Sequence, residues 1–187
     1  MNIALFASGT GSNVKNIIDY FKKNKKINIV LVISNNSSAG ALMHAKINDI
    51  EQLVISKSAL NESLQVIELL HSRDIKLVVL AGFLLKFPEK IIANFKGDII
   101  NLHPSLLPKF GGKGMFGNNV HKAVLSSKES KTGITIHYVN EHYDKGAIID
   151  QFEVPLSNKD TIDSIVLKIK ELELMHFPRT IEKLLNE

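Results

Sequence analysis

The segment KLVVLAG at residues 76–82 decides the fold class. Its apolar residues follow one another without alternation, which is typical of a strand that a parallel sheet buries on both faces. Similar short runs, rich in Ile, Val and Leu, alternate along the chain with stretches of helical period. We expect strands at residues 2–7, 27–34, 52–55, 76–81, 98–102, 132–139 and 147–154. We expect helices at residues 13–23, 39–48, 60–72, 89–94 and 120–126, and a closing helix from about residue 161.

This alternation of strands and helices predicts βαβ units and an α/β fold with a doubly wound, mostly parallel sheet. The last two expected strands differ, because they alternate apolar with polar residues and leave no room for a crossover helix between them. An antiparallel pair at one edge of the sheet is therefore expected. The chain of 187 residues is long enough to bury a full core, and a single domain over residues 1–187 is predicted.

Composition narrows the function classes. The chain contains no cysteine, which excludes thiolate catalysis and cysteine-ligated metals. Clusters of other metal ligands are also missing, so no metal is expected. The 23 basic and 19 acidic residues leave a net charge of +4, a mild field that favours anionic substrates rather than nucleic acid. With neither a signal-peptide pattern nor an apolar run of about 20 residues, a cytoplasmic protein that does not bind membranes is expected.

The segment SGTGSN at residues 8–13 lies where the first strand should give way to a helix. Ligands of open α/β sheets bind beyond the carboxyl ends of strands. A helix N-terminus offers backbone N–H groups and the positive end of the dipole, and Gly9 and Gly11 allow an anion to approach the backbone. Val14 replaces the third glycine of a dinucleotide fingerprint. The segment therefore predicts a cradle for one phosphate, and an ordinary glycine turn remains the alternative.

The segment INLHPSLLPKF at residues 100–110 places Asn101 and His103 two positions apart at the end of an expected strand. Their side chains should point to the same side, while Pro104 keeps the chain at His103 extended. An asparagine amide can donate to a developing oxyanion, and histidine handles a proton near neutral pH. The pair suits acyl transfer, and stabilisation of the loop remains an equal alternative.

Two later segments supply partners for this pair. Asp144 lies in a turn that ends at Gly146, and its carboxylate would raise the pKa of His103 if the fold brought them together. Thr135 and His137 share one face of the expected strand at residues 132–139. They are hypothesised to pack against the residues of the site without touching the substrate. The alternatives are a purely structural role for His137 and an ordinary turn at Asp144.

The order SGTGSN, VVLAGF, NLHPSLLP, TGITIHYV and DKGAII closely resembles the folate-dependent formyltransferases, and among them the phosphoribosylglycinamide formyltransferases. The resemblance runs from residue 1 to the final helix. It implies a single formyltransferase domain that transfers a formyl group from 10-formyltetrahydrofolate to the amine of 5-phosphoribosylglycinamide in purine synthesis. It further implies direct transfer, with protonated His103 and Asn101 stabilising the oxyanion, and no metal.

Carried over residue by residue, the resemblance also assigns the site. The segment KELELMHFP matches the family's glutamate followed five residues later by proline, and Lys57 is the nearest match to the family's arginine at the folate tail. The implied residues are Asn101, His103 and Asp144 for catalysis; Gly11, Ser12 and Asn13 for the substrate phosphate; Glu173 and Lys170 for the ribose; Leu84, Leu85, Lys86, Phe87, Asn101 and Lys57 for the folate; and Thr135 and His137 as supporting residues.

Three other functions remain open at this point. A formyltetrahydrofolate hydrolase or a nucleotide-sugar formyltransferase would use the same formyl chemistry on another acceptor. A noncatalytic module that senses a phosphorylated metabolite would use the SGTGSN cradle alone. The expected partners are small molecules, and a monomer or weak homodimer is expected.

Overall fold

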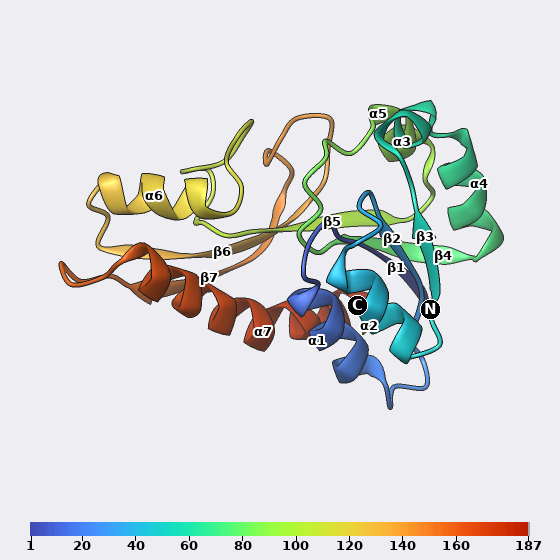
Figure 1. Ribbon diagram of the computed structural model, residues 1–187, viewed down its shortest axis with the longest axis horizontal. Coiled ribbons are helices and arrows are strands. Elements are labelled where there is room, and N and C mark those ends of the chain that lie inside the picture. The colour runs from blue at the N-terminus through green and yellow to red at the C-terminus, as the bar shows by residue number, and fades with distance from the viewer. Residues whose placement is uncertain (187) are drawn as a thin grey trace. The chain divides into compact units, whose positions relative to one another are not determined.

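The computed structural model describes residues 1–186 of the chain. These residues form two compact units, of which the first is Met1–Asn101 and the second begins at Leu102. The strands are β1 (Asn2–Phe6), β2 (Asn28–Ser34), β3 (Glu51–Val54), β4 (Ile75–Leu80), β5 (Asp98–His103), β6 (Lys131–Tyr138) and β7 (Ile148–Pro155). The helices are α1 (Ser12–Phe21), α2 (Gly40–Ile47), α3 (Lys57–Glu62), α4 (Leu64–Ser72), α5 (Glu89–Asn94), α6 (Asn118–Ser126) and α7 (Ile162–Asn186) (Figure 1).

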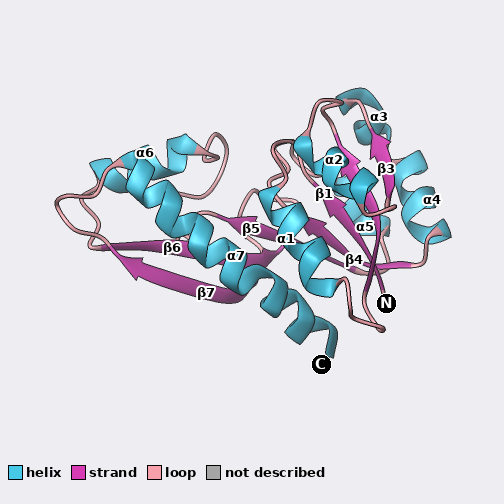
Figure 2. Ribbon diagram, turned by 60° about the horizontal axis from the view of Figure 1, so that its bottom comes forward, coloured by secondary structure: helices cyan, strands magenta, loops and turns pink. Residues whose placement is uncertain are grey.

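The first unit is built on parallel strands. β1 pairs with β2 and with β4, β2 pairs with β3, and β4 pairs with β5, all in parallel. Its central strands are apolar and buried, and Val78, Val79 and Ile100 are fully inaccessible to solvent. Figure 2 shows α1 and α2 in front of these strands and α5 behind them. The unbroken apolar run at residues 76–82 therefore contains a strand covered on both faces.

The second unit contains the antiparallel hairpin of β6 and β7 together with α6 and α7. The strand order of the sheet is β3-β2-β1-β4-β5-β6-β7, and β5 contributes its last two residues, Leu102 and His103, to the second unit. The predicted α/β fold, mostly parallel with an antiparallel edge pair, is confirmed. None of the helices in the described part of the chain combines the length and apolar character that a bilayer crossing requires.

One predicted helix is wrong in its extent. The single helix expected at residues 60–72 is two helices, α3 and α4, which meet at Ser63. Ser63 has a φ of 69°, and its hydroxyl donates to the carbonyl oxygen of Leu60 over 3.1 Å. A residue with positive φ cannot continue a right-handed helix, and no glycine or proline marks the position in the sequence.

Candidate active site

The loop at residues 8–11 lies at the carboxyl end of β1, as predicted. Gly11 caps α1 with a φ of 76°, and no side chain caps the helix. A Cβ on Gly11 would lie 2.5 Å from the Cα of Ala41, so only glycine lets the loop pass this close to α2. The first-turn N–H groups of a helix lack intrahelical acceptors. The geometry thus supports an anion cradle formed by Gly11, Ser12 and Asn13.

Ser8 ties this loop to the ends of two other strands. Its hydroxyl donates to Asn35 Oδ1 over 2.5 Å, just after β2, and accepts from the backbone N–H of Leu84 over 2.9 Å, just after β4. Its own N–H donates to the carbonyl of Gly82 over 3.0 Å. Ser8 therefore fixes the backbone at Leu84, where the resemblance places the folate. From the sequence, Ser8 was expected only as part of the glycine loop.

The four predicted folate residues after β4 differ in exposure. Leu84 is 54% exposed, and Lys86 is paired with Glu89 over 2.7 Å. Phe87 is only 4% exposed, with its ring edge-on to Phe6 at a centroid distance of 5.2 Å. The Phe87 side chain therefore belongs to the core, which leaves its backbone as the part that can meet a ligand.

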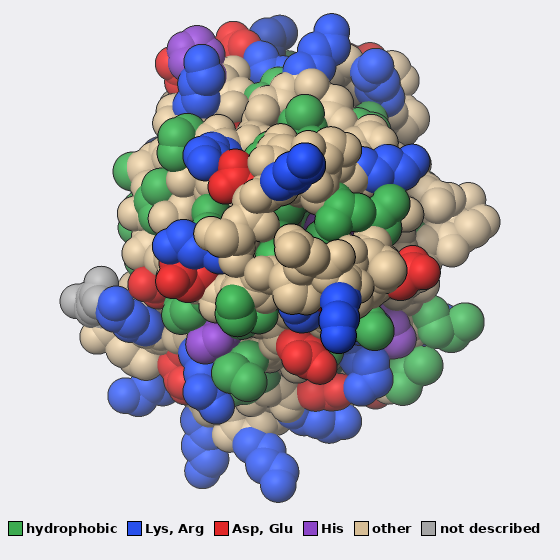
Figure 3. Space-filling view, turned by 90° about the vertical axis from the view of Figure 1, so that its left-hand side faces the viewer, with side chains coloured by type: hydrophobic (Ala, Val, Ile, Leu, Met, Phe, Trp, Pro, Cys, Tyr) green, Lys and Arg blue, Asp and Glu red, His purple; other side chains and the backbone are tan. Residues whose placement is uncertain are grey.

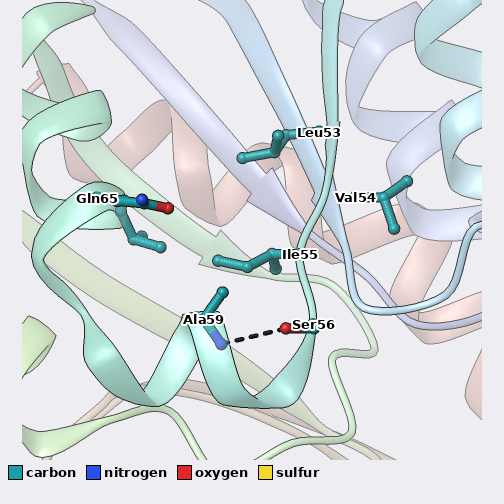
Figure 4. Close-up of a pocket in the computed structure, with 7 residues that line it drawn as sticks. Leu53, Val54, Ile55, Ser56, Ala59 and Gln65 are labelled. Carbon is teal, nitrogen blue, oxygen red and sulfur yellow. Dashed lines mark hydrogen bonds between the residues drawn. The ribbon is translucent and has the colours of Figure 1, made fainter.

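A separate cavity of about 360 Å³ lies at the carboxyl end of β3 (Figure 4). Lys57, the predicted partner of the folate tail, directly follows Ser56, which lines the cavity and caps α3 through Ala59 N–H. None of the predicted folate residues after β4 lines it. The lining residues are Leu53, Val54, Ile55, Ser56, Ala59, Gln65 and Val66.

Asn101 and His103 both belong to β5, which extends one residue beyond the expected strand at residues 98–102. His103 is 3% exposed, and Asn101 is half-buried. The structure brings the predicted partner of His103 to it, since His103 Nδ1 lies 3.6 Å from Asp144 Oδ2. This distance suits an ion pair but is too long for a hydrogen bond.

Two further groups hold the Asp144 carboxylate. Gly112 N–H donates to its Oδ2 over 2.8 Å, and its Oδ1 lies 3.7 Å from His137 Nε2. The backbone of Asp144 has a φ of 54°, in the left-handed region that aspartate tolerates better than most residues. His137, predicted as a supporting residue, therefore lies directly beside the carboxylate.

A carbonyl oxygen fixes the tautomer of His103. His103 Nε2 lies 2.9 Å from the carbonyl oxygen of Phe110. Because a carbonyl can only accept, Nε2 carries the hydrogen, and in the neutral ring Nδ1 holds the lone pair on the side of Asp144. The nitrogen that can take up a proton is thus the one that the carboxylate faces.

Burial determines the direction of the His103 pKa shift. Desolvation lowers the pKa of His103 below its usual 6.5, and the opposing effects of Asp144 and the Phe110 carbonyl do not offset it. Asp144 acts in the expected direction and raises the pKa, but burial outweighs its effect. For Asp144, burial acts to raise the pKa, yet the nearby ring of His137, the attraction to His103 and the hydrogen bond from Gly112 N–H leave the pKa below its usual range.

The buried histidines make stability depend on pH. Burial lowers the pKa of both His103 and His121, and the proximity of His103 lowers that of His121 further. Below pH 6.5 the unfolded chain therefore binds protons that the native state does not. The contribution of His103 and His121 to the free energy of unfolding is complete above pH 6.5 and is lost as the pH falls through their lowered native pKa values. We expect a smaller free energy of unfolding at pH 5.5 than at pH 7.5, measured by urea titration.

The variant His103→Gln removes one of these groups and should reduce the difference between the two pH values. Equal unfolding free energies at pH 5.5 and 7.5 in the wild type would contradict the prediction.

The remaining predicted residues lie on α7 of the second unit. Glu173 is half-buried and Lys170 is exposed, one helical turn apart on the same side of α7. The phosphate loop belongs to the first unit, whereas Asp144, His137, Glu173 and Lys170 belong to the second. In Figure 3, basic side chains are spread over the visible face with acidic ones among them, consistent with the mild net charge.

Known proteins resemble the chain over nearly its whole length. The family profile described as "Formyl transferase" matches residues 1–181. Phosphoribosylglycinamide formyltransferase of Haemophilus influenzae is 34% identical over 185 residues, which cover 96% of this chain and 85% of that protein. The chloroplastic enzyme of that name from Vigna unguiculata is 35% identical over 190 residues. The match covers 99% of this chain, which spans only 61% of the plant protein.

Solved structures agree with these relatives. The crystal structure of phosphoribosylglycinamide formyltransferase from Bacillus halodurans has a TM-score of 0.89 and 31% sequence identity, and covers 100% of this chain and 96% of that one. The structure of the same-named protein from Anaplasma phagocytophilum has a TM-score of 0.87 and 32% identity over 97% of this chain and 85% of that chain. The chain therefore belongs to the formyl transferase family.

Proposed function

We propose that the protein transfers the formyl group of 10-formyltetrahydrofolate to the amine of 5-phosphoribosylglycinamide, a step of purine synthesis. The observation that carries the proposal is the buried His103 with its Nδ1 lone pair turned toward Asp144. This arrangement suits a base that starts neutral and whose charge is stabilised after it takes up a proton. The relatives named above, with their common activity, support the choice of substrates.

The proposed chemistry is direct acyl transfer. 10-Formyltetrahydrofolate supplies the formyl group, which the substrate amine attacks. Asn101 donates a hydrogen bond to the formyl oxygen as that oxygen becomes negative. His103 accepts the proton that the amine loses, and the resulting imidazolium is stabilised by Asp144. The proton then passes to the departing folate nitrogen, so His103 returns to its neutral state.

Substrate binding is assigned to the predicted residues. The N-terminus of α1, with Gly11, Ser12 and Asn13, would hold the phosphate. Glu173 would accept hydrogen bonds from the ribose hydroxyls, with Lys170 nearby as a cation. The backbone at residues 84–87 and Lys57 would contact the folate.

The proposal is tested with the purified protein, 10-formyltetrahydrofolate and 5-phosphoribosylglycinamide, by following deformylation of the folate by absorbance. We expect deformylation only when the nucleotide is present, with one formylated nucleotide formed for each folate released. Equal deformylation without the nucleotide would indicate a hydrolase instead. Nucleotide binding without any turnover would indicate the metabolite-binding module.

A further inference from the structure

The backbone that follows His103 is held by a buried hydroxyl. Thr135 Oγ1, on β6, donates to the carbonyl oxygen of Ser105 over 2.7 Å and accepts from the N–H of Leu107 over 3.0 Å. Thr135 and Ser105 are both fully buried. A polar group buried in this way is costly to leave without a partner, so the contact fixes the turn strongly.

A second side chain, Gln151 on β7, completes this contact. Its Nε2 donates to the carbonyl oxygen of Leu107 and to Thr135 Oγ1, both over 2.9 Å. A hydroxyl can donate one hydrogen bond and accept two. With Ser105 as its acceptor and with Leu107 and Gln151 as its donors, the Thr135 hydroxyl therefore uses its full capacity.

The same stretch of backbone bears the groups that orient the candidate catalytic residues. Ser105 Oγ donates to the carbonyl oxygen of Lys109 over 2.8 Å, which links the start of the turn to its end. The next residue, Phe110, supplies the carbonyl oxygen that fixes the His103 tautomer. Two residues further on, Gly112 supplies the N–H that binds Asp144. Movement of the turn would disturb both contacts.

We infer that Gln151 is a positioning residue for formyl transfer, which acts by holding the turn at residues 105–112 so that its backbone orients His103 and Asp144. The inference rests on the proposed function for its kinetic consequence, but its structural consequence can be measured separately. Gln151 itself does not touch the reacting atoms. No feature of its sequence context singles it out, because it lies among alternating polar residues of an edge strand.

Gln151 is a better subject for mutation than Thr135. The Gln151 residue is exposed although its two amide contacts are partly buried, so the fold should survive its loss while the turn loses its anchor. Thr135 is fully buried, and the variant Thr135→Val leaves buried groups of the turn without partners.

The kinetic test compares Gln151→Leu, which removes both donors, with Gln52→Leu, the same change on the exposed strand β3. A displacement of about 1 Å near a reacting group can cost up to about 100-fold in rate. We expect kcat to fall by roughly 10- to 100-fold in Gln151→Leu. KM for either substrate should stay within about twofold, because no binding contact is lost. Gln52→Leu should match the wild type.

A double-mutant cycle tests whether Gln151 and Thr135 act through the same turn. Because Gln151 and Thr135 hold the same turn, the loss in the combined variant Gln151→Leu with Thr135→Val should be smaller than the product of the two single losses. Thr135→Ser, which keeps the hydroxyl, should recover most of the activity that Thr135→Val loses. Losses that multiply, or an unchanged kcat in Gln151→Leu, would overturn the inference.

Nitrogen-15 NMR of the histidine rings tests the inference without any turnover, with the His103 signals assigned by their absence in His103→Gln. The wild type should show the tautomer with hydrogen on Nε2, and this population should fall in Gln151→Leu but not in Gln52→Leu. If the wild type transfers no formyl group, the proposed function fails while this comparison still decides the role of Gln151. Identical His103 spectra in the wild type and Gln151→Leu would overturn that role.

Discussion

Replacement of His103 by alanine is expected to lower kcat/KM for formyl transfer by about 10²- to 10⁴-fold, the range for loss of a positioned acid or base. The His103 residue is 3% exposed, and its Nδ1 lies 3.6 Å from Asp144 Oδ2. A water molecule therefore cannot easily take the place of the imidazole beside the carboxylate. The proton that leaves the substrate amine would then have to pass to solvent. Steady-state rates at saturating and limiting substrate separate the effect on kcat from the effect on KM.

The matched control is His71→Ala, which removes an exposed histidine from α4. It should retain wild-type kinetics. Circular dichroism and thermal unfolding of both variants show whether the fold is kept. A His103→Ala protein that is folded and loses less than about tenfold in kcat/KM would remove His103 from the proton path.

The second large effect is expected at Asn101. Loss of one oxyanion donor costs about 10²- to 10³-fold in kcat in comparable acyl-transfer sites. Asn101→Ala should therefore lower kcat by this factor, while KM changes by less than about threefold, since the hydrogen bond forms mainly in the transition state. Measurement of both constants for each substrate tests this division.

Two further variants sharpen the Asn101 experiment. Asn101→Asp keeps the size of the side chain but replaces the amide donor with a negative charge, so it should lose at least as much activity as the alanine variant. Asn158→Ala, at an exposed turn position, should leave the kinetics unchanged. A change confined to KM in Asn101→Ala would assign the residue to ground-state binding instead.

The sheet could be predicted closely because periodicity and burial agree in it. The apolar runs at residues 2–7, 76–81 and 98–102 match β1, β4 and β5 to within one residue at each end. The break at Ser63 could not be predicted, because its positive φ depends on tertiary packing of a buried serine rather than on a glycine or proline. A single domain over the whole chain stays a prediction.

Much of the candidate site was accessible from motifs. The sequence offered Asp144 as a partner of His103 only on the condition that the fold brought them together, and the 3.6 Å between His103 Nδ1 and Asp144 Oδ2 meets that condition. His137, expected as a supporting residue, lies 3.7 Å from the Asp144 carboxylate. The carbonyl of Phe110 and the N–H of Gly112 could not have been found, because backbone groups leave no residue type to recognise. Gln151 was missed for a related reason, since its two acceptors come from segments far away in the sequence.

The direction of the His103 pKa shift could not be predicted, because the sequence names the neighbours of a group but not its burial. A carboxylate neighbour alone raises a histidine pKa. At 3% exposure, desolvation exceeds that effect and lowers the pKa of the ring below its usual value.

The left-handed backbone of Asp144 limits what mutagenesis at this position can reveal. Its φ of 54° is readily adopted by asparagine and glycine but strains alanine and, more severely, β-branched residues. A saturation library at this codon should thus separate into two groups by yield of folded protein, with asparagine and glycine in the high-yield group whatever their activity. The variant Asp144→Asn keeps the shape of the side chain and the backbone conformation, so its kinetics report the loss of the negative charge without a backbone penalty.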